Sequence, residues 1–112
     1  MKMVIAFLPP HRVERVARRL RRIPGFPGLT ASEARGHGHE KTEQPQDRQA
    51  ELTDFTPTAR VAMALGDDLV DPVLEAIYAE AHTGGAGDGK VYVAPLLEAL
   101  RIKTGERGPV AI

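Results

Sequence analysis

The 112-residue chain is long enough for one small domain, covering 1–112, which would bury about two-thirds of its unfolded surface. Fifteen basic and fifteen acidic side chains cancel, so no net charge attracts nucleic acid or an anionic membrane. The lack of cysteine excludes disulfides and thiolate chemistry. Because the apolar start is also too short for a signal peptide or a membrane span, we expect a cytoplasmic protein.

Two segments at the start of the chain have different periodicities. Residues 3–8 form a continuous apolar run that ends at two prolines, which predicts a central strand buried on both faces. From His11 the apolar residues recur every three or four positions and arginines cover the other side, which predicts an amphipathic helix. Its apolar stripe comprises Val13, Val16, Ala17, Leu20 and Ile23.

The middle of the chain contains two strand patterns and a long polar segment. Residues 29–35 alternate weakly and residues 59–65 alternate clearly, so both are predicted strands. Between them, residues 36–57 have neither period. Loops of this length are usually functional or disordered, so we interpret 36–57 as a mobile loop that docks on a partner.

A second helix and several shorter elements complete the chain. Asp67 or Asp68 is predicted to cap a helix whose apolar residues repeat at helical spacing as far as Ala81. The later predictions are a strand at 91–94, a short helix or turn at 95–100 and a last short strand at 101–103.

The order strand, helix, strand, strand, helix, strand is typical of the α+β ferredoxin-like fold, a βαββαβ sandwich whose helices cover one side of the sheet. A long loop would join its second and third strands. The other side of the sheet would stay open unless a dimer or trimer buried it, and the small side chains of Ala62 and Ala64 would allow close approach.

The stretch 83–90, Thr-Gly-Gly-Ala-Gly-Asp-Gly-Lys, suggests an anionic ligand. Glycines reach positive φ, so amide N–H groups can converge on one point, and Lys90 adds a charge suited to phosphate. Gly84 to Lys90 matches the start of the P-loop pattern, G-x-x-x-x-G-K. However, Val91 stands in place of the hydroxyl residue that holds magnesium and the helix precedes the loop, so a P-loop nucleotidase is not expected. From these residues alone, a glycine-rich turn without a ligand remains the alternative.

The chain resembles the PII signal-transduction family in three consecutive parts. These are the stretch 83–90, called the glycine loop below, the strand after it, and the segment Arg101-Ile102-Lys103-Thr104-Gly105-Glu106-Arg107-Gly108. The segments 28–38 and 54–57 resemble the entry to that family's long loop and the exit from it, so the resemblance covers essentially the whole chain. It implies a homotrimer with three clefts between subunits, each able to hold ATP, ADP or AMP, with magnesium as a possible companion. It also implies that the loop docks on a target protein, such as a membrane transporter or an enzyme.

The resemblance further implies which residues hold the nucleotide. Phosphates would contact the glycine loop of one chain and two cationic side chains of its neighbour, because guanidinium and ammonium groups suit phosphate. The base of the long loop would close the cleft, and Thr30 would contact the adenine. The implied nucleotide-binding residues are Thr30, Gly36, His37, Gly38, Gly87, Asp88, Gly89, Lys90, Arg101 and Lys103.

Several positions depart from the family's pattern. Lys103 stands where an arginine is usual and loses its bidentate geometry, which predicts weaker nucleotide binding. The loop lacks the tyrosine that is modified in members reporting nitrogen status, so uridylylation is not expected. Glu40 and Thr58 stand where the family has a glutamine and a lysine. The carboxylates of 2-oxoglutarate would meet the negative charge of Glu40 and would lose the positive charge of the lysine, so binding of 2-oxoglutarate is doubtful. The chain therefore resembles a divergent PII-like branch, some members of which accompany transport systems such as heavy-metal efflux pumps.

Three other kinds of function have weaker support in the sequence. His37 and His39 alternate in an extended segment, which suggests a metal-responsive protein linked to efflux, although stable metal sites usually need three or four ligands. The arginines of the first helix suggest RNA, but the central strands offer only Phe7 for base stacking, so no nucleic-acid partner is expected. The sequence offers no catalytic triad or paired carboxylates, and binding explains Asp88 and Lys90, so the protein is not expected to be an enzyme.

Overall fold

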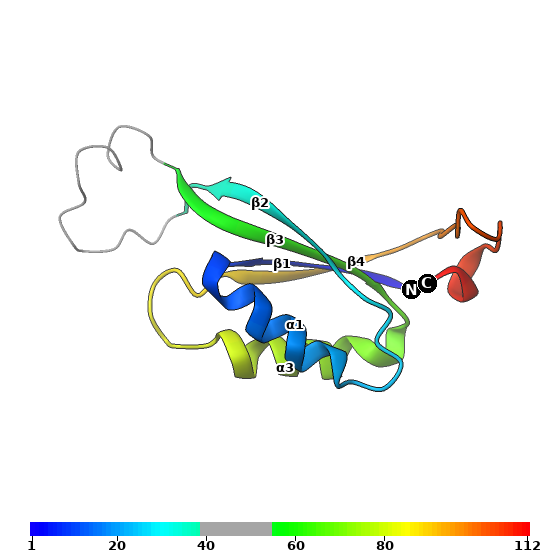
Figure 1. Cartoon of the computed structure of the whole chain (residues 1–112), viewed down its shortest axis with the longest axis horizontal. Coiled ribbons are helices and arrows are strands. Elements are labelled where there is room, and N and C mark those ends of the chain that lie inside the picture. The colour runs from blue at the N-terminus through cyan, green and yellow to red at the C-terminus, as the bar shows by residue number, and fades with distance from the viewer. Residues whose placement is uncertain (39–54) are drawn as a thin grey trace.

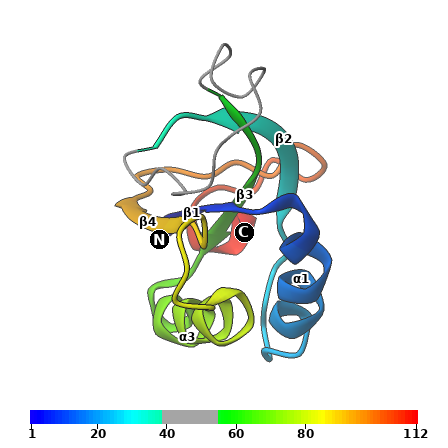
Figure 2. The same ribbon diagram turned by 90° about the vertical axis from the view of Figure 1, so that its left-hand side faces the viewer.

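An antiparallel sheet with strand order β2-β3-β1-β4 is the central layer of the computed structural model, which describes residues 1–38 and 55–112 (Figure 1). Two helices of the described residues lie side by side on one face of this sheet (Figure 2). The elements are β1 (Lys2–Leu8), α1 (Val13–Arg21), β2 (Thr30–Gly36), β3 (Thr56–Leu65), α3 (Val70–Ala81) and β4 (Lys90–Pro95). Their order and arrangement confirm the predicted ferredoxin-like α+β fold.

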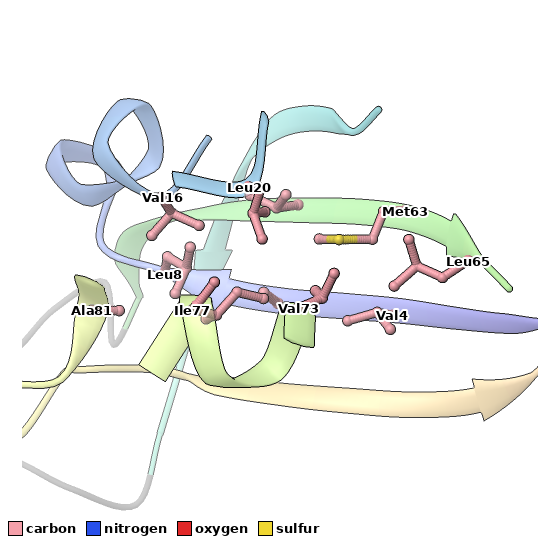
Figure 3. Packing of buried hydrophobic residues seen from close by; sticks show 12 residues of the cluster. Val4, Leu8, Val16, Leu20, Met63, Leu65, Val73, Ile77 and Ala81 are labelled. Atoms are coloured by element: carbon pink, nitrogen blue, oxygen red, sulfur yellow. The ribbon is translucent and has the colours of Figure 1, made fainter. Parts of the chain in front are cut away.

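The hydrophobic core lies between the helices and the sheet (Figure 3). Alternate residues of the two central strands face the helices, as the pleat of a strand requires, and the apolar stripes of both helices meet them. The buried set includes Val4, Ala6 and Leu8 of β1, Val61, Met63 and Leu65 of β3, Val16 and Leu20 of α1, and Val73 and Ile77 of α3. The helical periodicity of the sequence therefore identified the buried sides of both helices.

The second face of the sheet is open, which corrects the prediction that the first strand is buried on both sides. Met3, Ile5 and Phe7 alternate with the core residues of β1 and are only half-buried. On β3, Ala64 pairs with Met3 and Ala62 with Ile5, so small side chains flank this apolar row. A continuous apolar run requires cover on both faces, but within the described residues a single chain supplies helices for one face only.

Asp67 and Asp68 do not cap the second helix as predicted. Asp67 lies in a 3-10 turn, η2 (Asp67–Leu69), which precedes α3. Its carboxylate lies 3.1 Å from the N-terminal ammonium of Met1 and 3.6 Å from Nζ of Lys2. The hydrogen bond from that ammonium and the charge of Lys2 lower the pKa of Asp67. The side chain therefore ties the start of β1 to the turn instead of binding free helix amides.

The C-terminal segment contains neither the short helix nor the last strand that the sequence suggested. Residues 96–99 lack regular structure, and an isolated bridge joins Leu100 to Arg107. The predicted strand at 101–103 lies in a turn instead, in which the N–H of Gly105 donates to the carbonyl of Arg101 at 2.8 Å. Gly105 has a φ of 77°, which allows the chain to reverse there.

Among the described residues, no helix has both the length and the apolar character needed to cross a membrane.

Candidate functional site

The glycine loop connects α3 to β4 at one end of the sheet (Figure 1). Because α3 ends at Ala81 and β4 begins at Lys90, the helix precedes the loop, in the reverse order to a P-loop. Gly84, Gly87 and Gly89 have φ values of 86°, 92° and 104°. These values lie in the left-handed region that glycine tolerates without a steric penalty, as the sequence predicted.

Asp88 holds the first half of this loop in place. Its Oδ2 accepts hydrogen bonds from the N–H of Thr83 at 2.7 Å and the N–H of Gly84 at 2.9 Å. Its Oδ1 accepts a short hydrogen bond from the hydroxyl of Thr83, and Nδ1 of His82 lies 3.8 Å from Oδ2. The amides that converge at this point therefore bind a carboxylate of the loop itself.

These contacts lower the pKa of Asp88 from 3.8 to about 2. The hydroxyl of Thr83 has the largest effect, followed by the N–H groups of Thr83 and Gly84, because all three donate to the ionised carboxylate. The loop consequently carries a negative charge at neutral pH. A bound anion would have to be held by cations and main-chain groups, not by the side chain of Asp88.

Gly89 packs against β1 so closely that no side chain fits. A Cβ atom at this position would lie 1.9 Å from the carbonyl oxygen of Phe7 and 3.0 Å from its carbonyl carbon. Glycine is therefore required both for the backbone conformation and for the close approach. This approach fixes the point at which Lys90 enters the sheet.

Lys90 lies on the open face of the sheet beside a second cation and two aromatic rings. In the strand register Lys90 pairs with Phe7, which pairs with Arg60 on its other side. The two cations therefore flank Phe7, on strands about 4.8 Å to either side of β1. The ring of Phe7 contacts Tyr92 edge to face, with ring centroids 6.3 Å apart. Within the described part of the chain, Lys90 makes no ion pair, which leaves its ammonium free to bind an anion.

The segment that follows β4 and contains Arg101 and Lys103 lies at the opposite end of the sheet from the glycine loop (Figure 1). The strand β4 alone, from Lys90 to Pro95, spans about 17 Å at about 3.4 Å per residue, and the chain then continues away from the loop. Nη2 of Arg101 donates to the main-chain oxygen of Ile112 at 3.0 Å, and the side chain of Lys103 is exposed in the turn. One chain therefore does not bring together the two cationic parts of the predicted phosphate site.

The base of the long loop lies at the same end of the sheet as the glycine loop (Figure 1). The pairing of β2 with β3 ends at Gly36 and Thr56, and His37 and Gly38 follow. The ring of His37 lies 6.1 Å from that of Phe55, measured between centroids. Of the predicted cleft-closing residues, Gly36 thus ends β2, and His37 and Gly38 follow the end of the sheet on the side of the glycine loop.

Thr30 lies on the other edge of the sheet from Lys90. It begins β2 and pairs with Ala62, which in turn pairs with Ile5. Since β3 and β1 lie between the two edge strands, Thr30 and Lys90 are separated by about three strand spacings, or about 14 Å. Within one chain, the predicted adenine contact is therefore distant from the predicted phosphate contact.

The predicted metal ligands are only partly within the described residues. His37 is described, whereas His39 and Glu40 lie outside the described residues, so the metal site stays a prediction. Among residues 1–38 and 55–112, no group of three or more metal-ligating side chains lies together. Thr58, where the resemblance led us to expect a lysine, donates its hydroxyl to the carbonyl of Leu8 at 3.0 Å.

Two residues that organise the loop were not identified from the sequence. Thr83 supplies two of the hydrogen bonds to Asp88, and His82 lies beside the same carboxylate while its ring stacks on Tyr78 at a centroid distance of 4.6 Å. The only available signal was a hydroxyl residue five positions before an aspartate. Such a spacing carries little information in a glycine-rich loop, where no regular element fixes the direction of the side chains.

The fold and the loop define a small ferredoxin-like α+β protein with a glycine-rich loop between its second helix and its last strand. Residues 1–106 match the model of the family described as Nitrogen regulatory protein P-II. The chain therefore belongs to the nitrogen regulatory protein P-II family, whose members are regulatory proteins and not enzymes.

The chain is similar to relatives over its whole length. It is 40% identical to the nitrogen regulatory protein P-II of Azospirillum brasilense and 37% identical to the nitrogen regulatory protein GlnK of Escherichia coli strain K12, with 100% of each chain covered in both cases. A crystal structure of Arabidopsis thaliana PII bound to citrate matches with a TM-score of 0.80 and 32% identity. That match covers 99% of this chain and 91% of the Arabidopsis chain.

Replacing Gly89 by alanine should disrupt the junction of the glycine loop with β1. The new Cβ would overlap the carbonyl of Phe7, so we expect the free energy of unfolding to fall by about 3 kcal/mol or more. Urea unfolding at matched protein concentration measures this change. Gly85→Ala is the control, because Gly85 lacks a left-handed φ and its nearest neighbour would lie 3.4 Å away. Equal losses for the two variants would contradict the close approach.

Acidification should release the first half of the loop between pH 3.8 and about 2. Because the folded-state pKa of Asp88 is below its ordinary value, its hydrogen bonds contribute fully above that value and are lost as the pH falls through about 2. The amide NMR signals of Thr83 and Gly84 should shift with this titration in the wild-type protein. In the Asp88→Asn variant, the same signals should not shift over this pH range. A midpoint at the ordinary carboxyl value would show that the carboxylate is not held.

Proposed function

We propose that this protein is a cytoplasmic homotrimeric signalling protein that binds adenine nucleotides between its subunits and regulates a partner protein through the loop 36–57. ATP and ADP are the expected ligands, with AMP as a further candidate and magnesium as a companion of the phosphates. The target would be a membrane transporter or an enzyme, and nucleic acid is not a partner. This proposal applies to the chain what its resemblance to the PII family implies.

The distribution of exposed apolar side chains supports assembly. Leu97 and Ile102 are 91% and 94% exposed in the single chain, and Leu100 and Val110 on the same C-terminal segment are also exposed. On the open sheet face, Tyr92 adds another large exposed ring. A small domain gains stability when such surfaces are buried against further copies of itself.

The separation of the cationic residues carries the proposal of a site between subunits. Lys90 lies beside the glycine loop at one end of the sheet, whereas Arg101 and Lys103 lie at the other end. A nucleotide's phosphates extend over only a few ångströms, so they would meet all three cations only where the ends of two chains adjoin. By the same argument, Thr30 would come from the chain that supplies Arg101. The Arabidopsis relative is bound to citrate, a compact polyanion, which is consistent with anion binding in this fold.

The position of residues 36–38 suggests how the ligand would affect the loop. Gly36 belongs to the last pair of the β2–β3 ladder, residues 37 and 38 follow it, and this end of β2 lies at the same end of the sheet as the glycine loop. A nucleotide that contacts both segments would favour one conformation of the loop base. Binding would thus select the loop conformations that fit the partner, which is a shift of population and needs no catalysis.

Isothermal titration calorimetry with ATP, ADP and AMP tests the proposed site. We expect saturable binding to the wild-type protein, weakened about tenfold or more in Lys90→Ala because a charge-assisted contact to phosphate is lost. Arg21→Ala is the control, since that exposed arginine is the last residue of α1, whose C-terminal end lies away from the glycine loop (Figure 1). Titrations with 2-oxoglutarate and bicarbonate identify any second effector. Absence of binding to all three nucleotides at ~1 mM, a level near the weakest specific affinities, would overturn the proposal.

A further inference from the structure

The outer side of α1 carries a concentration of positive charge that nucleotide binding does not use. Between residues 12 and 22 the chain has six arginines and one glutamate, although its net charge is zero, so this short segment has a net charge of +5 and the remainder −5. Arginines three and four residues apart on a helix repel one another. The segment therefore maintains an arrangement that is locally unfavourable.

Two of these arginines are oriented by an acidic residue of the neighbouring helix. Nε of Arg15 lies 3.2 Å from Glu80, and Nη1 of Arg19 lies 3.8 Å from the other oxygen of the same carboxylate. The side chain of Glu80 is only 23% exposed, so this contact holds α1 against α3. Among the described residues, Arg18 and Arg22 make no ion pair, and both are exposed.

These side chains line a shallow groove of about 530 Å³ along α1. Arg15, Arg18, Arg19 and Arg22 contribute its cations, and Glu14, Glu80 and His11 complete its wall. From Glu14 to Arg22 the helix axis rises about 12 Å, which is the length of about four residues of extended peptide. Arg18 and Arg22 are about 6 Å apart along the axis, close to the distance of about 6.6 Å between alternate side chains of an extended strand.

The chemistry of the groove favours carboxylates on a peptide over a phosphate-rich surface. Glu14 and Glu80 would repel the closely spaced phosphates of a membrane or a nucleic acid, whereas a peptide can place its charges between them. The apolar side of α1, with Val16, Ala17 and Leu20, is buried in the core, so no apolar side chains remain to insert into lipid. The groove also lacks an aromatic side chain on which bases could stack.

We propose that the arginine groove of α1 binds an acidic segment of a partner protein, in extended conformation, through bidentate contacts of Arg18 and Arg22 with alternate carboxylates. Arginine suits this role because its planar guanidinium matches a carboxylate with two parallel hydrogen bonds. The groove is on the helical side of the molecule, away from the open sheet face. It runs along α1 from the end of the sheet that holds the glycine loop, because Glu80 lies in the last turn of α3, just before that loop (Figure 1). None of the groove residues is among the proposed nucleotide-binding residues, so either proposal can fail without the other.

Fluorescence anisotropy with a labelled peptide of about six residues, glutamate alternating with serine, tests this proposal. We expect binding that weakens as salt concentration rises and that falls about tenfold in the double variant Arg18→Gln and Arg22→Gln. The matched control is Arg12→Gln with Arg21→Gln, which removes the same charge from side chains that do not line the groove. That control should retain its affinity within about twofold, and thermal unfolding checks that both variants fold.

Three results would overturn the proposal. The peptide could fail to bind the wild-type protein. Alternatively, the two double variants could weaken binding equally, which would show that affinity depends only on the net charge of the protein and not on the groove. Vesicles containing phosphatidylserine, or a single-stranded oligonucleotide, could instead bind more tightly than the peptide with the same dependence on Arg18 and Arg22. In that case the partner of the groove would be a phosphate surface.

Discussion

The antiparallel sheet separates the two groups of cations that a phosphate ligand would need. Lys90 enters the sheet beside the glycine loop because Gly89 allows the loop to approach the carbonyl of Phe7. Arg101 lies beyond the far end of β4, in a turn fixed by main-chain hydrogen bonds. Because the length of β4 separates them, ligand binding by all these groups would require a second chain. Nucleotide binding and assembly would then be linked, and each would stabilise the other.

Because the helices cover only one face of the sheet, the surface of the molecule has an apolar side and a charged side. The helices α1 and α3 bury one face, while the other face and the C-terminal segment expose large side chains such as Tyr92 and Ile102. The helical side instead exposes arginines. Under the two proposals, the apolar surfaces join copies of the chain, the loop end senses the ligand, and the charged helix contacts a separate partner.

Much of the fold could be predicted because periodicity reports burial directly. The apolar spacing of α1 and α3 and the alternation of β3 identified their buried sides, since a side chain's direction in a regular element follows from its position. The prediction that β1 is buried on both faces was wrong for Met3, Ile5 and Phe7. An apolar run indicates that a strand face is buried, but it does not indicate which chain covers that face. For residues 95–100 the sequence predicted a short helix or turn, and the structure has no helix there.

The candidate site was less predictable than the fold. Glycine content and Lys90 identified the loop, but the role of Asp88 depends on the backbone turning Thr83 and Gly84 toward it, which no spacing encodes. The cap predicted at Asp67 failed because a charge distant in sequence, the ammonium of Met1, competed for the carboxylate. Contacts of this kind depend on the folded chain.

A subunit-mixing experiment tests the central claim most directly. One chain carries Lys90→Ala, and another carries Arg101→Ala with Lys103→Ala, so neither alone should bind ATP tightly. After the two are unfolded and refolded together in equal amounts, a cyclic trimer should regain about a quarter of the wild-type number of sites, because each mixed trimer contains one interface with both intact halves. Mixed trimers, confirmed by native mass spectrometry, that regain no ATP binding would contradict the account.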